Sequence, residues 1–289
     1  MNQLKLLLLP LLTAATLYAS STSCSNIYFG NIAPDFINTK LTAKTKELCY
    51  QQFAVMHSGV SRTPLWSAEH LTKEKLSQKA KRDNAFHAEE KLSSDDRAEL
   101  NDYAHSGYDR GHMAPSADFT DPQSNHECFT LANMVPQDHN NNTGIWSSIE
   151  GATRYLTQQK GEIYIITGPI FEGSNIKRMN GRVFVPTKLF KAIYIPSSNQ
   201  AAAYLTENAS GNDYKVISIA ELEKLIGINL FPKMSQDVKN HVATLPVPKP
   251  YHGGSSKNET NTQSEKPQSQ GNGFFDKLER KIHNYNKGY

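Results

Sequence analysis

The stretch SGYDRGHMAPSADF, residues 106–119, places an acid, an arginine, a glycine and a histidine at consecutive positions from Asp109 to His112. A histidine titrates near neutral pH and can accept a proton from water, and an arginine guanidinium fits the oxygens of a phosphate. Gly111 removes the side chain between them, which lets a ligand or a strand approach the backbone. Taken alone, these residues fit a polar turn as well as an active site, so the rest of the chain must decide.

A second segment, HNNNTGIWSSIE at residues 139–150, supplies oxygen ligands. Asn142, Trp146 and Glu150 recur every four residues, so we expect them on nearly one stripe of a helix. Mg²⁺ prefers oxygen ligands and keeps several waters, so one amide ligand plus a carboxylate that holds the waters would suffice. The alternative is that Asn142 caps the helix and Glu150 is a solvated charge.

A third segment, SRTPLW at residues 61–66, carries Arg62 ahead of Pro64 and Trp66. Its alternative is a surface turn. Around the three segments, the spacing of apolar residues predicts alternating helices and strands. The expected helices are a short one near TAKTKELCYQQ (42–52), one from Ser67, one over 143–160, and one that starts with a capping box at Ser218 and Glu221. The expected strands are YQQFAVMHS (50–58), CFTLANMVPQ (128–137, whose strand is expected to end at Pro136), EIYIITGPIF (162–171), RVFVPTKLFKAIYI (182–195) and AAAYLT (201–206).

Together the segments resemble the DNA/RNA non-specific endonucleases of the ββα-metal superfamily, which include secreted bacterial nucleases and endonuclease G. The resemblance runs from about Phe53 to about Ile228 and keeps the family's order of segments. It implies an α+β domain whose central antiparallel sheet is flanked by helices and carries a ββα-metal active-site unit. It also implies hydrolysis of phosphodiester bonds in DNA and RNA, which are bound through their phosphates, with 5′-phosphate ends as products.

The same resemblance implies a role for each site residue. His112 is expected to be the general base that activates water. Asn142 is expected to be the single direct protein ligand of Mg²⁺, with Mn²⁺ as an alternative ion, and Glu150 to order the waters of the metal. Arg62 and Arg110 are expected to bind the phosphate and to stabilise the charge of the transition state.

The N-terminus is typical of a secretory signal peptide over residues 1–19. Lys5 precedes an apolar run from Leu6 to Leu12, and small residues follow, so we expect cleavage after Ala19. The run is too short to cross a membrane as a helix, and no later segment is long enough. The mature protein is therefore expected to be secreted or periplasmic, with its nuclease domain over residues 20–250.

The cysteines fit an exported protein. Cys24 and Cys49 both precede the polar motif, and an oxidising compartment preserves disulfides, so we expect these two to be joined. Cys128 is expected to be a small buried apolar residue in a strand. After Pro250, residues 251–272 are polar and of low complexity, which predicts a flexible linker.

The last segment, residues 273–289, predicts a short amphipathic tail helix with Phe274, Phe275, Leu278 and Ile282 on one face. Docking on the domain and fraying into solvent are both open for it. Nothing in the pattern specifies an oligomeric state.

Composition leaves the partner open. Apolar residues make up 38% of the chain, enough for a core, and a net charge of +3 permits a polyanionic partner without requiring one. Two alternative functions differ in class. A catalytically inactive nucleic-acid-binding or toxin-like protein of the same fold is disfavoured, because the family's site positions are filled. A zinc hydrolase would need ligands such as His105, His126 or His139, whose spacings match no common zinc pattern.

Overall fold

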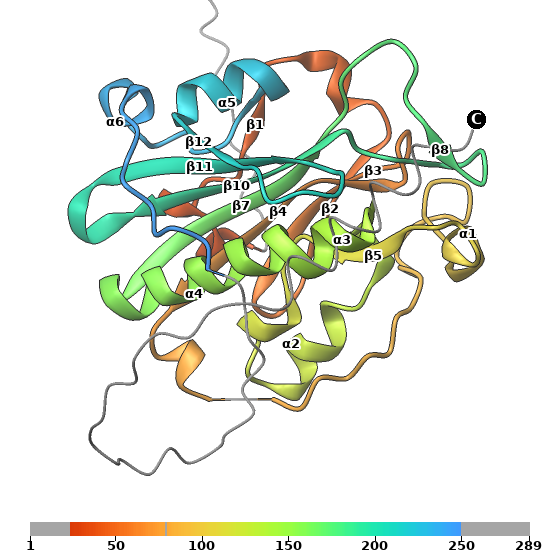
Figure 1. Ribbon diagram of the computed structural model, residues 1–289, viewed down its shortest axis with the longest axis horizontal. Coiled ribbons are helices and arrows are strands. Elements are labelled where there is room, and N and C mark those ends of the chain that lie inside the picture. The colour runs from red at the N-terminus through yellow and green to blue at the C-terminus, as the bar shows by residue number, and fades with distance from the viewer. Residues whose placement is uncertain (1–23, 79, 250–289) are drawn as a thin grey trace, which may run out of the picture. The chain divides into compact units, whose positions relative to one another are not determined.

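Seven antiparallel strands form the central sheet of the protein, whose computed structural model describes residues 24–78 and 80–249. Their order across the sheet is β12-β11-β10-β7-β4-β3-β2 (Figure 1). The strands are β2 (Thr45–Cys49), β3 (Phe53–Ser58), β4 (Thr63–Thr72), β7 (Glu162–Ile170), β10 (Lys188–Ile195), β11 (Gln200–Glu207) and β12 (Lys215–Ile217). The expected α+β class with a central antiparallel sheet is confirmed.

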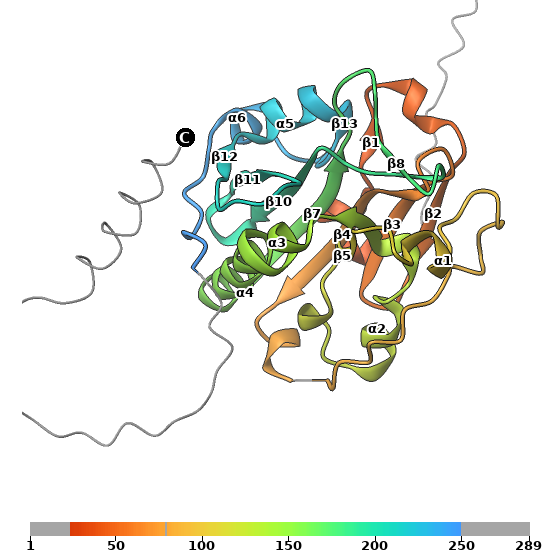
Figure 2. The same cartoon turned by 45° about the vertical axis from the view of Figure 1, so that its right-hand side comes forward.

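Helices cover both faces of this sheet, because alternate residues of its strands are apolar on each side. α5 and α6 lie on one face and α4 on the other (Figure 2). On the α5 side, Trp66 of β4 shares an apolar core with Leu222; on the α4 side, Ile165 of β7 shares another with Ile149. The helices are α1 (Leu100–Tyr103), α2 (Pro122–Glu127), α3 (His139–Asn141), α4 (Ser147–Lys160), α5 (Ile219–Ile226) and α6 (Gln236–Asn240).

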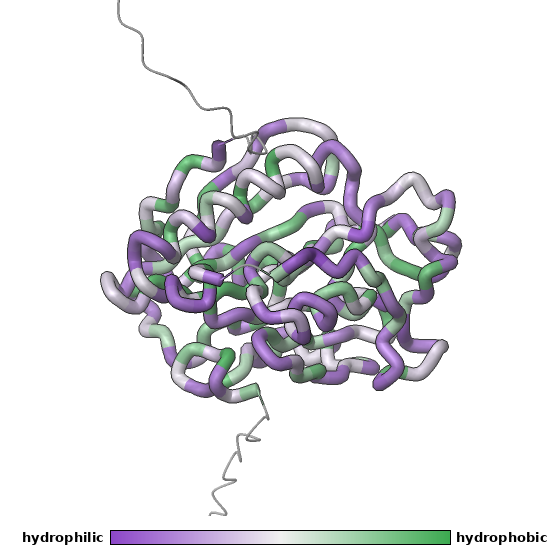
Figure 3. Tube along the Cα trace, turned by 90° about the horizontal axis from the view of Figure 1, so that it is seen from below, coloured by the Kyte–Doolittle hydropathy of each residue, from purple (hydrophilic) through white to green (hydrophobic). Residues whose placement is uncertain are grey.

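Three short strand pairs lie outside the central sheet. They are β1 (Asp35–Phe36) with β13 (Ile228–Asn229), β5 (Asp109–His112) with β6 (Met134–Gln137), and β8 (Arg178–Met179) with β9 (Val183–Phe184). The β5–β6 pair followed by α3 and α4 is the strand-strand-helix unit that carries the site. Figure 3 views the trace from below, where hydrophilic and hydrophobic segments alternate along the chain.

The helix expected from Ser67 is wrong, because this segment belongs to β4. β4 pairs with β3 on one side and with β7 on the other, so its backbone groups are satisfied by distant strands. The Ser67 hydroxyl donates to the Asn133 side-chain oxygen at 2.9 Å and does not cap a helix. Long-range pairing has overridden the local signal.

Two further expectations need correction. The short helix near 42–52 is instead β2, the edge strand of the sheet. In the expected strand 128–137 only Met134–Gln137 is extended, and Cys128 lies directly after α2. The start of α2 was readable, since Asp121 caps the helix and Pro122 occupies its first turn.

The helix expected over 143–160 is confirmed, with one irregularity at its start. Asn142–Trp146 forms a π-helical turn in which Gly144 departs from helical angles (φ −101°, ψ −108°), and regular α4 follows. The expected helix after Ser218 is also present. The Ser218 side chain accepts the Glu221 amide at 3.1 Å, and the helix ends at Gly227 in the left-handed conformation.

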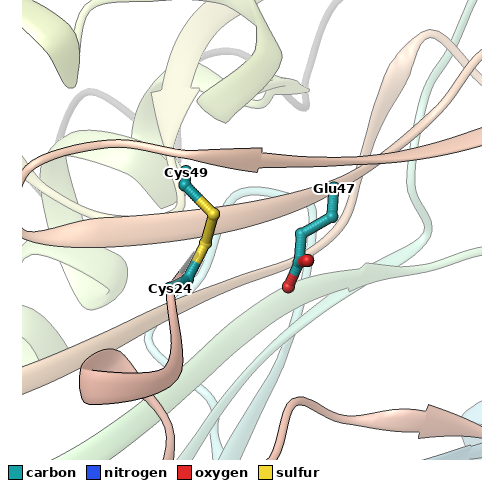
Figure 4. Close-up of side chains that lie close together, drawn as sticks. All are labelled: Cys24, Glu47 and Cys49. Carbon is teal, nitrogen blue, oxygen red and sulfur yellow. A yellow bond between two sulfur atoms is a disulfide. The ribbon is translucent and has the colours of Figure 1, made fainter. Parts of the chain in front are cut away.

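The expected disulfide between Cys24 and Cys49 is present, with the two Cα atoms 5.5 Å apart. Figure 4 shows the bond together with the nearby Glu47. Because the two sulfurs are joined to each other, neither is a thiolate that could bind a metal ion. Cys128 is fully buried, as expected, and its thiol contacts the Asn125 carbonyl at 3.1 Å.

The predicted signal peptide (1–19), linker (251–272) and tail helix (273–289) lie outside the described residues and stay predictions. Within the two described ranges, no helix is both long and apolar enough to cross a membrane.

Candidate active site

The β5–β6 pair places the DRGH residues beside a cavity of about 590 Å³. In this pair Arg110 lies opposite Pro136, and His112 lies opposite Met134. The polar and aromatic residues that line the cavity are Arg82, Phe86, Tyr103, Tyr108, Asp109, Arg110, His112, Ser116, Asn142, Thr143, Ser147 and Glu150. The structure therefore brings together four of the expected site residues, and Arg62 is not among them.

His112 is held as a neutral base with a free nitrogen. It is 8% exposed, and within the described residues its Nε2 has no hydrogen-bond partner. Burial, and secondarily the charge of Arg82, lower the pKa of His112 to about 3. The Phe129 ring packs edge-on at 5.0 Å, and the Trp146 indole donates to the His112 carbonyl at 3.4 Å. The His112 ring thus packs against the apolar Phe129 side chain and also lines the polar cavity.

Gly111 is required by the neighbouring strand. A Cβ atom at this position would lie 1.9 Å from the side-chain oxygen of Gln137. Gln137 is fully buried, and its amide donates to the Asn141 side-chain oxygen at 2.7 Å. The missing side chain therefore makes room for β6, and Gln137 in turn connects DRGH to α3, the short helix directly before Asn142.

Asp109 orients Asn142. The Asn142 amide nitrogen donates to the Asp109 carboxylate at 2.9 Å, and His139 contacts the same carboxylate oxygen at 2.9 Å. Among the described residues the Asn142 side-chain oxygen accepts no hydrogen bond, and the residue lines the cavity. The amide is thereby fixed with its oxygen left as a potential metal ligand.

Glu150 lines the same cavity from the first turn of α4. Burial raises the pKa of this carboxyl to about 7, against the opposing charge of Arg154. The expected stripe is realised in part: Asn142 and Glu150 both line the cavity, whereas Trp146 is fully buried in the core. An amide oxygen and a carboxylate that ionises near neutral pH form a hard-oxygen donor set, which fits Mg²⁺ with bound waters.

Two arginines line the cavity, and one of them was missed by the sequence reading. The Arg110 guanidinium lies 4.8 Å over the Phe86 ring, and its Nε is buried without a hydrogen-bond partner in the described part of the chain. Arg82 lies 4.9 Å over the Phe129 ring and donates to the hydroxyl of Ser116. Arg82 belongs to the polar stretch KAKRDN, whose composition resembles an ordinary loop.

Arg62 is engaged elsewhere. Its guanidinium donates to the Asp95 carbonyl at 2.9 Å and to the Arg182 carbonyl at 3.1 Å, which ties the start of β4 to two loops. Arg154, a second residue that the sequence reading missed, lies one turn beyond Glu150 and pairs with the buried Asp118 at 2.8 Å. Its four-residue spacing from Glu150 was the available signal.

Comparisons with known proteins show which proteins the chain resembles as a whole. Residues 17–237 match the family described as DNA/RNA non-specific endonuclease, a longer match than the segments quoted above. A nuclease of Nostoc sp. is 31% identical over 221 residues, which is 71% of this chain and 80% of that protein. The mitochondrial nuclease EXOG of Danio rerio is 31% identical over 218 residues, 68% of this chain and 64% of that protein.

The fold also has a solved counterpart. A chain in the crystal structure of an EndoG/EndoGI complex matches with a TM-score of 0.62 and 25% identity, covering 66% of this chain and 88% of that chain. The present chain thus spans less than two thirds of the EXOG relative but most of the Nostoc protein and of the EndoG chain.

Proposed function

Because the chain belongs to the DNA/RNA non-specific endonuclease family, we propose that it is a metal-dependent endonuclease that hydrolyses phosphodiester bonds in DNA and RNA. It acts with little sequence specificity and leaves 5′-phosphate ends. The observation that carries this proposal is the Nε2 of His112, which has no hydrogen-bond partner in the described part of the chain and lies at a cavity that Arg82, Arg110 and two oxygen-donor side chains also line.

His112 accepts the proton of the attacking water. Its low pKa keeps the imidazole neutral at neutral pH, so the free nitrogen is ready to act as a base. An anionic phosphate beside the ring favours the protonated form, which makes His112 a stronger base once the substrate is bound.

Arg82 and Arg110 bind the phosphate. The diester is anionic and repels electron-rich nucleophiles, so two guanidinium groups lower the barrier by neutralising the charge that builds in the transition state. Among the residues that the structure describes, the Nε of Arg110 has no acceptor, so it is an unused donor at this position. Recognition through phosphate reads no base edge, which accounts for weak sequence preference. Arg82 takes the place that the sequence reading gave to Arg62.

Asn142 would hold the metal directly and Glu150 would order its waters. Mg²⁺, with Mn²⁺ as the alternative, would when bound neutralise charge on the phosphate and on the leaving oxygen. The hydrogen bond from Asn142 to Asp109 keeps the amide oxygen in its ligand orientation. Ionised Glu150 is the form that accepts hydrogen bonds from metal-bound waters.

The site of action is outside the cytoplasm, in the periplasm or the medium. The N-terminal pattern and the disulfide support this part of the proposal.

The experiment is incubation of the purified mature protein with plasmid and with RNA, with and without EDTA. Cleavage of both substrates, loss of cleavage in EDTA, and recovery with Mg²⁺ or Mn²⁺ are expected. Recovery with Zn²⁺ alone would favour a zinc hydrolase, and binding without cleavage at any metal concentration would favour an inactive nucleic-acid-binding protein.

A further inference from the structure

A second cavity adjoins the candidate active site and shares a wall with it. Its volume is about 540 Å³. The wall common to both cavities consists of Arg82, Ser116, Ala117, Ser147 and Glu150. His112 lines only the first cavity, whereas Gln158 lines only the second. A phosphate held at the shared wall therefore has room for substrate on both sides.

One face of α4 runs from the first cavity into the second. Glu150, Arg154 and Gln158 recur every four residues along it, so they lie on one stripe. Arg154 is committed to its ion pair with Asp118. Gln158 is half-buried, and its side-chain amide makes no hydrogen bond within the described residues. It is therefore a free donor and acceptor at the wall of the second cavity.

We propose that the second cavity is the subsite for the nucleoside that carries the leaving oxygen, and that Gln158 is its hydrogen-bonding contact. This inference rests on the proposed function. In the hydrolysis the water oxygen bonds to phosphorus while the P–O3′ bond breaks, and these two oxygens lie roughly in line. The water proton goes to His112, and O3′ leaves with the bonding electron pair and takes a proton from solvent. Because His112 lies on the first-cavity side, the departing nucleoside lies in the second cavity.

The cavity fits such an occupant in size and chemistry. Small-molecule sites have volumes of about 300–1,000 Å³ and combine apolar walls with a few polar groups. Here Leu76 and Phe119 supply apolar surface, and Gln158 supplies an amide, whereas the amide of the lining residue Asn125 is buried and already bonded to the chain. A glutamine amide both donates and accepts, so it serves any base or the sugar without selecting among sequences.

The test compares Gln158→Ala with Gln159→Ala, the exposed neighbour that does not line either cavity. Two substrates separate the subsite from the chemistry: a short DNA oligonucleotide, and bis(4-nitrophenyl) phosphate, whose leaving group is not a nucleoside. For Gln158→Ala, KM for the oligonucleotide is expected to rise by about two- to tenfold, the loss of one neutral hydrogen bond, with kcat unchanged. Its rate on the small diester stays at the parent value, and Gln159→Ala matches the parent on both substrates.

A second variant, Gln158→Trp, fills the cavity and is expected to reduce oligonucleotide cleavage further while sparing the small diester. Equal losses on both substrates, or a parent-like KM for the oligonucleotide in both Gln158 variants, would overturn the subsite. Failure of the proposed function has a different signature, because the parent protein itself would then cleave neither substrate.

Discussion

Replacement of Gly111 by alanine tests whether close strand contact positions the site. The new Cβ would lie 1.9 Å from the Gln137 side-chain oxygen and 2.6 Å from the Gln137 Cβ. Gln137 cannot swing into solvent, since it is fully buried and bonded to Asn141. Either the β5–β6 pair must separate or Gln137 must abandon its hydrogen bond.

The expected cost follows from this overpacking. Forcing extra volume into a packed site costs about 1–3 kcal/mol. At about 2–4 °C per kcal/mol for a chain of this size, the melting temperature should fall by roughly 2–12 °C. The strain lies directly beside His112, so plasmid cleavage, assayed below the melting transition, should fall as well.

Gly151→Ala is the matched control. Gly151 lies within α4 and has open space around the position of a Cβ atom, so alanine there should be neutral or stabilising by up to about 1 kcal/mol. The pair Gly111→Ala with Gln137→Ala removes the clashing side chain, so the two substitutions should cost less together than the sum of their separate effects. An unchanged melting temperature for Gly111→Ala, or strictly additive costs, would refute the reasoning.

Three other predictions concern the polar residues of the cavity. Since burial raises the pKa of Glu150 to about 7, its carboxylate forms as the pH rises through that region, and the cleavage rate should rise over the same range. Glu150→Gln should remove this rising part of the pH–rate profile. An unchanged profile in the variant would count against Glu150 as the group that orders the metal-bound waters. Asn142→Ala should raise the Mg²⁺ concentration needed for half-maximal rate, measured by titration, and an unchanged midpoint would remove it as the ligand. Arg82→Ala should lower the turnover number, whereas Arg62→Ala should mainly lower the melting temperature, because Arg62 donates to the Asp95 and Arg182 carbonyls. The reverse pattern would show that Arg62, and not Arg82, binds the phosphate.

The parts of the fold that the sequence predicted correctly are those with strong local periodicity. α4 has apolar residues at helical spacing from Ile149 to Leu156, and α5 has a serine cap, so both could be located without tertiary information. β4 could not be located in this way. Both of its faces are buried, and Ser67 and Glu69 resemble the start of a helix, so only pairing with β3 and β7 decides its conformation.

The residues that line the cavity also differ in how readily the sequence points to them. The four that were predicted from the sequence fall in two continuous motifs, one on a strand and one at a helix: His112, Arg110, Asn142 and Glu150. Arg82 comes from a loop with no periodic signal, and it reaches the cavity through its contacts with Phe129 and Ser116. Contacts of this kind depend on the folded chain, so residue type and spacing alone could not reveal them.

The most direct measurement of the central claim is the single-turnover rate of plasmid nicking by His112→Ala beside the parent protein, at saturating protein and Mg²⁺. Loss of a general base predicts a fall of about 10²–10⁴-fold, with DNA affinity and melting temperature close to those of the parent. A parent-like nicking rate in the folded variant would contradict the assignment of His112 as the base.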